Sequence, residues 1–352
     1  MNKNSKIYVA GHTGMVGSAI VRKLISEGYK NIIGKSSSEL DLRNQFAVKS
    51  FFDRERPEYV FLAAAKVGGI STNCTHPAEF IYNNLMIESN VIHASFKNQI
   101  KKLLFLGSSC IYPKNCSQPI KEEYLLTGPL EPSIEAYALA KISGLKLCQY
   151  YRKQYGCDFI SAIPPNLYGS GDNFDLETSH VFSGIMRKMH LAKCFENSDF
   201  GSIRKDLDKR PLKNIDGEFS NQEIIDLLET FGIVKIPSGK CQLTLLGSGT
   251  PKREFLHVED LANAVYFLMK KYSKNEHINI GTGEDITINN LANLIKGEIG
   301  FLGIINWGDS RLDGAMQKLL CVDSVHNLNW RHTYPIIEGI KGLYKFYKKE
   351  QV

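Results

Sequence analysis

The sequence lacks the marks of several large classes of protein. Its eight cysteines are scattered and none belongs to a CxxC pair, so no metal site is expected. Its uncharged apolar runs are short, and the run from Tyr59 to Ala65 is far below the length that spans a bilayer. The first residues, up to Lys6, are mostly polar and do not form a signal peptide. We therefore expect a cytoplasmic protein that does not enter a membrane.

A strong charge of either sign is also missing. The formal net charge is +6 over 352 residues, which is too weak to predict a nucleic-acid partner but would help to attract a phosphorylated ligand. With 43% hydrophobic and 23% charged residues, the composition is that of an ordinary globular protein. The length suits one large domain or two modest ones.

A glycine-rich turn follows the first apolar segment. Residues 6–10 are β-branched and apolar and predict a strand, while residues 18–27 have helical spacing. A glycine turn between strand and helix lets the backbone approach a pyrophosphate at the helix N-terminus. The spacing is GxxGxxG, not the commoner GxGxxG. We expect a dinucleotide to contact this turn at Gly11, Thr13, Gly14, Met15, Val16 and Gly17.

The second predicted strand, residues 31–34, ends in a lysine and three serines. An NAD enzyme usually offers an acidic residue here, about 20 residues after the glycines, to bind the ribose hydroxyls. Lys35 and Ser36 better suit a ribose 2′-phosphate, so we expect NADP(H), although a solvated loop is a competing interpretation. Asp41 is placed to meet an adenine amino group, with Leu42 beside it in the predicted cofactor site.

Strands and helices alternate along the first half of the chain. Further strands are expected at 59–65, 103–106 and 159–163, and helices at 46–56, 80–97 and from 137 to about 155. This alternation predicts an α/β fold with a Rossmann-type, doubly wound parallel sheet. Ligands bind such sheets at the carboxyl ends of the strands. We therefore add to the expected cofactor site Ala63, Ala64, Ala65, Pro164, Asn166 and Leu167.

A serine, a tyrosine and a lysine carry the expected chemistry. Ser108 follows a buried strand, and Tyr137 and Lys141 are four residues apart at a helix start, which puts them on one face. A serine that holds a carbonyl oxygen while a tyrosine protonates it is the apparatus for reducing a ketone with a hydride donor. The lysine cation is expected to lower the pKa of Tyr137. A YxxxK pair alone would be a chance match, so its surroundings decide.

Several longer motifs show a resemblance to a known family. The chain resembles the GDP-L-fucose synthases, which are GDP-4-keto-6-deoxy-sugar epimerase/reductases of the extended short-chain dehydrogenase group. The resemblance covers about residues 5–194 and 241–345, and related enzymes act on the corresponding GDP-heptose. The motifs that carry it are GHTGMVGSAI, AAAKVGGI, LLFLGSSCIYP, YALAK, NLYG, DNF, SHV, GSGTPKREFLHVEDLA and RLDG.

The resemblance implies a Rossmann domain that binds NADPH, a smaller α/β domain that binds the GDP-sugar, and a homodimer formed through two long helices per subunit. The first domain is expected at 1–168 plus about 255–283, and the second at 169–254 plus 284–352. By position, Ser108 and Tyr137 bind the 4-keto oxygen and Lys141 holds the nicotinamide ribose. The expected sugar-nucleotide contacts also include Ser109, Cys110, Asn166, Arg187, Leu246, Arg253 and Lys318.

Cys110 and His180 match the epimerisation acid and base of that family, and His180 also belongs to the expected cofactor site. Protons on carbons 3 and 5 are acidic because they flank the ketone at carbon 4. One group must remove a proton and another must return it on the opposite face, roles that suit a thiol and an imidazole. Tyr137 and Ser108 would stabilise the enolate.

Some positions depart from the family pattern. Thr13 and Ser37 stand where arginines commonly contact the 2′-phosphate, and Leu246 replaces an aromatic residue. Residues from about 195 to 240 form an insertion, in which Ser220 and Glu223 predict a capped helix that ends near Gly232. The insertion either reshapes the sugar pocket for a larger sugar, such as a heptose, or elaborates the surface or the dimer.

Two other functions stay open from the sequence. One is an NAD-dependent sugar-nucleotide 4,6-dehydratase or 4-epimerase, although the dehydratase needs an acidic pair where Ser109 and Cys110 stand. The other is a non-catalytic nucleotide-binding protein, which usually loses the tyrosine or the lysine. The sequence does not decide between a hexose and a heptose, the product stereochemistry, whether epimerisation is retained, or how strictly NADPH is preferred over NADH.

Overall fold

The computed structural model describes residues 1–350, apart from the side chains of Ile70, Ser71 and Leu312. The chain divides into two compact units, residues 1–171, 254–284 and 318–334 in the first, and residues 172–253, 285–317 and 335–352 in the second. Residues 318–334, which we expected in the second domain, belong to the first unit. Their backbone is anchored there, because Leu320 N–H donates to Glu254 and Cys321 N–H donates to the carbonyl of Ile120.

The first unit is built on a six-stranded sheet with the order β11-β5-β4-β3-β1-β2, in which every pair of neighbours is parallel. The expected doubly wound parallel sheet is confirmed. The chain order reverses between β1 and β3, which is where open α/β sheets bind ligands. The strands are β1 Ile7–Ala10, β2 Ile32–Ile33, β3 Tyr59–Leu62, β4 Lys102–Leu106, β5 Phe159–Ile163 and β11 Ile278–Asn279.

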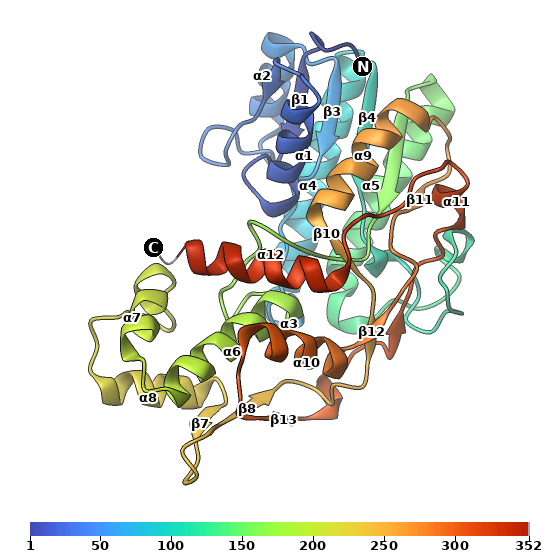
Figure 1. The fold of residues 1–352 in the computed structure, drawn as a ribbon. Helices are drawn as coiled ribbons and strands as arrows, with labels where there is room; N and C mark the ends of the chain where they lie inside the picture. Colours follow the sequence, from blue (N-terminus) through green and yellow to red (C-terminus); the bar gives the residue numbers. More distant parts are fainter. Residues whose placement is uncertain (351–352) are drawn as a thin grey trace. The chain divides into compact units, whose positions relative to one another are not determined.

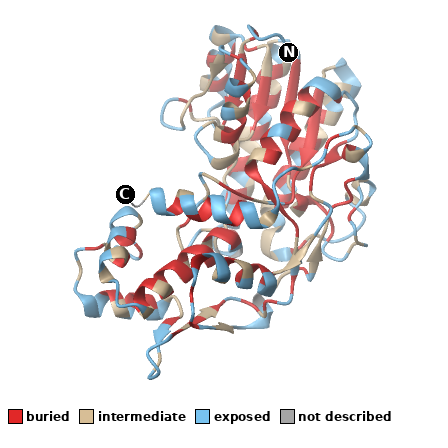
Figure 2. Cartoon of the chain, viewed as in Figure 1, coloured by how far each residue is buried: buried red, intermediate tan, exposed pale blue. Residues whose placement is uncertain are grey.

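The central strands are apolar and buried along their length, as expected for parallel strands with helices on both faces (Figure 2). In Figure 1, α1 packs against α9, while α4 packs against both α2 and α5. Strand β3 ends at Leu62, so the expected strand over 59–65 is three residues too long. The helices are α1 Met15–Ser26, α2 Gln45–Glu55, α4 Pro77–Lys97, α5 Glu135–Tyr155 and α9 Val258–Lys271.

Shorter elements complete the first unit. Strands β6 Asn166–Tyr168 and β10 Phe255–His257 pair in parallel. Helix α3, Ile70–Thr75, was not predicted from the sequence, because six residues are too few to show helical periodicity. The remaining pieces are α11 Asp323–His326, and the 3₁₀ turns η1 Ser109–Ile111, η2 Glu122–Tyr124 and η3 Pro132–Ile134.

The second unit combines helices with two small sheets. Strand β8 pairs in parallel with β13 and antiparallel with β7, and β9 pairs antiparallel with β12. Its helices are α6 Val181–Glu196, α7 Phe200–Lys209, α8 Asn221–Thr230, α10 Ile288–Ile299 and α12 Ile336–Lys349, with the turn η4 Ser310–Leu312. Its strands are β7 Ile233–Lys235, β8 Cys241–Leu245, β9 Lys252–Arg253, β12 Ile286–Thr287 and β13 Ile304–Trp307, and β14 Gln317–Lys318 lies at the unit boundary.

The inserted segment folds as α7, α8 and β7. The capping box at the start of α8 is confirmed, because Ser220 Oγ accepts from Glu223 N–H and Glu223 accepts from Ser220 N–H. Helix α7 and strand β7 were not expected. Strand β7 extends the sheet of the second unit, so the insertion is an integral part of that unit.

Within residues 1–350, no helix is both long and apolar enough to cross a bilayer. The side chains described there include no cluster of three or more histidine, cysteine, aspartate or glutamate residues suited to a metal ion.

Candidate active site

The glycine turn after β1 has the shape of a dinucleotide cradle. Gly11 has a φ of +84°, and a Cβ there would lie 2.9 Å from the Ala64 backbone. A Cβ on Gly17 would lie 2.0 Å from the carbonyl oxygen of Gly11. These two glycines are therefore required by the fold itself. Gly14 is exposed and a Cβ on it would meet nothing closer than 3.5 Å, so its small size serves an approaching ligand instead.

Helix α1 begins directly after this turn and leaves its N-terminus open. Gly14 is the N-cap, and among the described residues no side chain caps the helix. The first N–H groups of an α-helix have no partner within the helix and attract anions. Met15 and Val16 are half-buried in this first turn, and Thr13 is exposed beside it. The turn therefore fits a pyrophosphate.

In the loop after β2, the carboxylate of Glu39 is bound by neighbouring donors of the same loop. Lys35 Nζ lies 2.9 Å from Glu39 Oε1, and Ser36 donates from both N–H and Oγ–H to Glu39 Oε2, at 2.9 and 2.8 Å. The Lys35 and Ser36 donors lower the pKa of Glu39 to about 2. The two residues that we expected at the 2′-phosphate thus converge on one oxyanion, which is here the carboxylate of Glu39.

The other expected cofactor residues lie at the ends of the neighbouring strands. Asp41 is half-buried and forms an ion pair with Arg43 at 2.8 Å, which lowers the pKa of Asp41. Asn166 is exposed, and its side-chain amide donates to the Glu254 carbonyl at 3.3 Å. Half-buried positions are taken by Leu42, Ala63, Ala64, Ala65 and Leu167, whereas Pro164 is buried.

Ser108 caps the short turn η1 at the end of β4. Its Oγ accepts from Cys110 N–H at 3.3 Å, which fixes the two residues relative to one another. Ser108 and Cys110 are half-buried, while Ser109 between them is buried. The side chains of Ser108 and Cys110 are thus the reachable ones in this turn, and a substrate contact of Ser109 stays a prediction.

Tyr137 and Lys141 lie in the first two turns of α5. Lys141 is only 3% exposed, and its Nζ donates to the carbonyl of Leu106 at 3.0 Å. The same Nζ lies 2.9 Å from Glu88 Oε1 and 5.8 Å from the centre of the Tyr137 ring. No pattern in the sequence predicts a carboxylate at this position, which is taken by Glu88 of α4.

The expected lowering of the Tyr137 pKa is wrong. Burial raises the pKa of Tyr137 well above its usual value, and the nearby Cys110 and Glu88 raise it further. The lysine does not reverse this, because its charge is compensated by a carboxylate at ion-pair distance. Tyr137 is therefore a neutral phenol at ordinary pH, which is the form that can donate a proton.

His180 is the N-cap of α6 in the second unit and is exposed to solvent. Although the residue is exposed, neighbouring protein atoms partly desolvate the ring and lower the pKa of His180, which favours the neutral imidazole. Asp172 belongs to the same unit, and burial raises its pKa to about 7. Cys110 belongs to the first unit, so each member of the expected epimerisation pair is described within its own unit.

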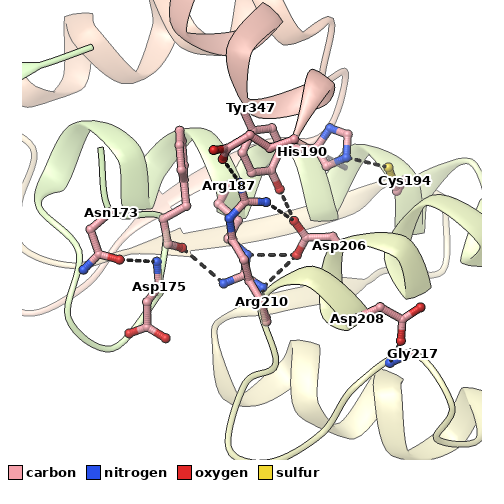
Figure 3. Close-up of polar contacts among 12 residues, drawn as sticks. Asn173, Asp175, Arg187, His190, Cys194, Asp206, Asp208, Arg210, Gly217 and Tyr347 are labelled. Carbon is pink, nitrogen blue, oxygen red and sulfur yellow. Dashed lines mark hydrogen bonds and ion pairs between the residues drawn. The ribbon is translucent and has the colours of Figure 1, made fainter. Parts of the chain in front are cut away.

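Arg187 does not serve a ligand, and that prediction is wrong. The residue is fully buried on α6, and its guanidinium lies 2.8 Å from Asp206 of α7 (Figure 3). It also donates to the backbone carbonyls of Phe174 and Arg210. Tyr347 donates to the same Asp206 carboxylate from α12. Arg187 therefore joins three parts of the second unit at its core.

The next residue, Lys188, is an accessible cation on the same helix. It is half-buried, and burial lowers its pKa. Among the described residues it has no recorded hydrogen bond or ion pair. Adjacent helical residues point about 100° apart, so only one of this pair faces the core. The Arg-Lys sequence alone does not say which one, because that depends on how α6 packs in the second unit.

Three further residues, Leu246, Arg253 and Lys318, were expected to contact the sugar-nucleotide. The Arg253 guanidinium donates to the carbonyls of Lys252 and Asp313, at 2.8 and 3.1 Å. Leu246 is 73% exposed in the same unit, and Lys318 is half-buried in the first unit. Their contacts with a ligand stay predictions.

Comparisons with known proteins agree with this geometry. A model of the NAD dependent epimerase/dehydratase family matches residues 7–208 and 220–281. The chain belongs to this family. It is 46% identical over 352 residues to a protein named putative GDP-L-fucose synthase 2 of Arabidopsis thaliana, covering 100% of this chain and 94% of that protein.

Two solved structures from Campylobacter jejuni are also similar across the whole chain. A GDP-6-OMe-4-keto-L-xylo-heptose reductase has a TM-score of 0.91 and 41% identity, covering 99% of both chains. A GDP-mannoheptose C4 reductase with NADP bound has a TM-score of 0.85 and 41% identity, with the same coverage. Family members of known structure thus include reductases of GDP-heptoses.

Proposed function

We propose that this protein uses NADPH to reduce the 4-keto group of a GDP-4-keto-6-deoxy sugar, either a hexose or a heptose. The carrying observation is the packing of the start of α5, which bears Tyr137 and Lys141, against the turn η1 that Ser108 caps at the end of β4. Reduction of a ketone needs a proton donor, and a raised tyrosine pKa preserves one. The same reaction class is named for the similar GDP-heptose reductases.

The cofactor would lie along the carboxyl ends of β1 and β3. Gly14 and the open N-terminus of α1 would take its pyrophosphate, and the Lys35 loop would take its 2′-phosphate. When bound, the nicotinamide supplies a hydride for carbon 4. Ser108 Oγ–H would donate to the ketone oxygen and orient it, and Tyr137 would pass its proton to that oxygen.

Epimerisation at carbons 3 and 5 is the second part of the proposed activity. Cys110 is half-buried beside Ser108, and His180 has a lowered pKa that keeps its imidazole ready to accept a proton. Tyr137 and Ser108 would hold the enolate oxygen between the two proton transfers.

We also propose a homodimer built on α4 and α5, in the cytoplasm. These two helices are each 21 residues long and pack against each other. They expose Tyr82, Leu139, Tyr150 and Tyr155, each by 41–61% of its surface. A second copy laid on this surface would bury those aromatic and aliphatic side chains.

The test is an incubation in deuterated water. The protein receives NADPH and GDP-4-keto-6-deoxy-mannose, with the matching GDP-4-keto-6-deoxy-heptose in parallel. We follow the nicotinamide absorbance and then measure the product mass. Oxidation of NADPH with two deuterons fixed on carbon means an epimerase/reductase. Oxidation without carbon-bound deuterium means a reductase alone. The faster sugar identifies the substrate, and no oxidation with either sugar would contradict the proposal.

Cys110→Ala separates the two activities. The variant should still reduce a ketone that has been epimerised beforehand, because Tyr137 and Ser108 are intact. It should lose deuterium exchange at carbons 3 and 5. Cys116→Ala is the matched control, since it removes another half-buried cysteine of the first unit that has no assigned role. Exchange that persists in Cys110→Ala would show that another group is the base.

A further inference from the structure

Glu88 is a buried carboxylate that the proposed proton transfer does not yet use. It lies on α4 and is 1% exposed. Its Oε1 lies at ion-pair distance from Lys141 Nζ, 2.9 Å, and among the described residues neither of its oxygens has a hydrogen-bond partner. An isolated buried carboxylate is costly, and replacing a buried ion pair by apolar residues often stabilises a protein. Glu88 is therefore poorly explained as a stabilising residue.

The packing of α5 against α4 makes room for this carboxylate. A Cβ on Gly144 would lie 2.6 Å from Glu88 Oε2 and 2.6 Å from the Phe105 ring. Glycine costs helix stability in the middle of α5, roughly 1 kcal/mol relative to alanine for a helix interior. Gly144 thus keeps open the space through which Glu88 reaches Lys141.

The charged and titratable groups around the pair come from three elements. Tyr137 and Cys148 face it from α5, and Cys110 faces Tyr137 from η1. Burial is the main reason for the raised pKa of both Tyr137 and Cys148, and Glu88 raises each further. Burial also raises the pKa of Glu88, and Lys141 opposes that shift as the one cation near the carboxylate among the described residues.

We propose that Glu88 is a positioning residue for the reduction, which holds Lys141 at the end of β4 and cancels its charge, so that Tyr137 stays protonated until it reacts. This rests on the proposed function. In that step the Tyr137 O–H bond breaks and the product O–H bond forms, while the hydride from the cofactor supplies the electron pair of the new C–H bond.

A charge cycle tests the assignment in the cofactor-free protein. The variants are Glu88→Gln, Lys141→Met and the double variant, each made with and without Tyr137→Phe. Tyrosinate formation is followed by ultraviolet absorbance against pH. Subtracting the curve of the same protein with Tyr137→Phe leaves the titration of Tyr137 alone. Glu88→Gln should lower the pH at which the Tyr137 phenolate forms by about one unit or more, because the charge of Lys141 is then uncompensated. Lys141→Met should shift it upward.

The double variant should titrate like the wild type, because it removes a neutral pair. It also leaves no unpaired buried charge, so it should fold even where a single variant does not. Glu88→Asp keeps the charge and should titrate close to the wild type. A wild-type titration in Glu88→Gln, or an equal shift in Glu88→Asp, would reduce Glu88 to a packing role. A strongly lowered titration in the double variant would also contradict the proposal.

A second measurement uses the sugar substrate. In the pH profile of kcat/KM, the alkaline limb should move to lower pH in Glu88→Gln. The Kd for NADPH, measured by fluorescence, should change little. Ser95→Ala removes another buried polar group of α4, whose Oγ donates to the Val91 carbonyl, and should leave the limb in place. If the wild type reduces neither sugar while the phenolate titrations shift as expected, the proposed function fails and the role of Glu88 stands.

Discussion

At the scale of single residues, Tyr137 carries the most direct prediction. Tyr137→Phe removes only the phenol O–H, so we expect kcat for ketone reduction to fall by roughly 10²–10⁴-fold. NADPH binding should be nearly unchanged, because Lys141 and the glycine turn are intact. Tyr150→Phe, at an exposed position of the same helix, is the matched control. Near-normal turnover in Tyr137→Phe would remove this residue from the reaction.

Cofactor choice is also a matter of single residues. Lys35→Ala should weaken NADPH more than NADH, because the lost cation faces the 2′-phosphate position. Glu39→Gln should tighten NADPH roughly two- to fivefold, since it removes the carboxylate that competes for Lys35 and Ser36. Both effects should shrink as salt is added.

Lys49→Ala is the control for this cofactor test, because Lys49 forms an exposed i,i+4 pair with Asp53 on α2. Fluorescence titration of the wild type and of the three variants, each with NADPH and with NADH, measures the affinities. Equal changes for NADPH and NADH would place Lys35 and Glu39 away from the phosphate.

At the scale of elements, the buried ion pair between α6 and α7 makes the inserted segment structural. Asp206→Asn leaves Arg187 buried without its carboxylate, so we expect a loss of about 3–5 kcal/mol in the free energy of unfolding. Asp208→Asn on the same helix changes an exposed side chain and should cost about 0.5 kcal/mol. Urea unfolding followed by circular dichroism measures both. A small effect of Asp206→Asn would mean that α7 is a loosely attached surface element.

The elements also show where local sequence signals are sufficient. The Ser220–Glu223 capping box and the strand over residues 159–163 were expected as the structure has them, because a cap and an apolar run are determined by adjacent residues. Helix α7 was missed although it supplies Asp206. Its residues are mostly polar, and the few large apolar ones, Phe200, Ile203 and Leu207, give too short a stripe to recognise before their packing partners are known.

At the scale of the whole molecule, the prediction concerns assembly. A double change of Tyr82→Glu and Tyr150→Glu should convert the proposed homodimer into monomers, because each charge would be buried in the interface. Light scattering measures the mass. Phe46→Glu, at an exposed aromatic position on α2, should leave the mass unchanged. A wild type that is monomeric at every concentration would contradict the proposed dimer.

The sequence by itself determined the parallel sheet, the glycine turn and the identity of Ser108, Tyr137 and Lys141, because these follow from periodicity and from spacing between near neighbours. The tertiary structure alone decided what surrounds them. It surrounded Tyr137 with protein, which raises the pKa of that residue instead of lowering it, and it placed Glu88 against Lys141 and Asp206 against Arg187. In both cases the deciding partner comes from a different helix, and desolvation and charge compensation depend on which side chains meet in the folded chain.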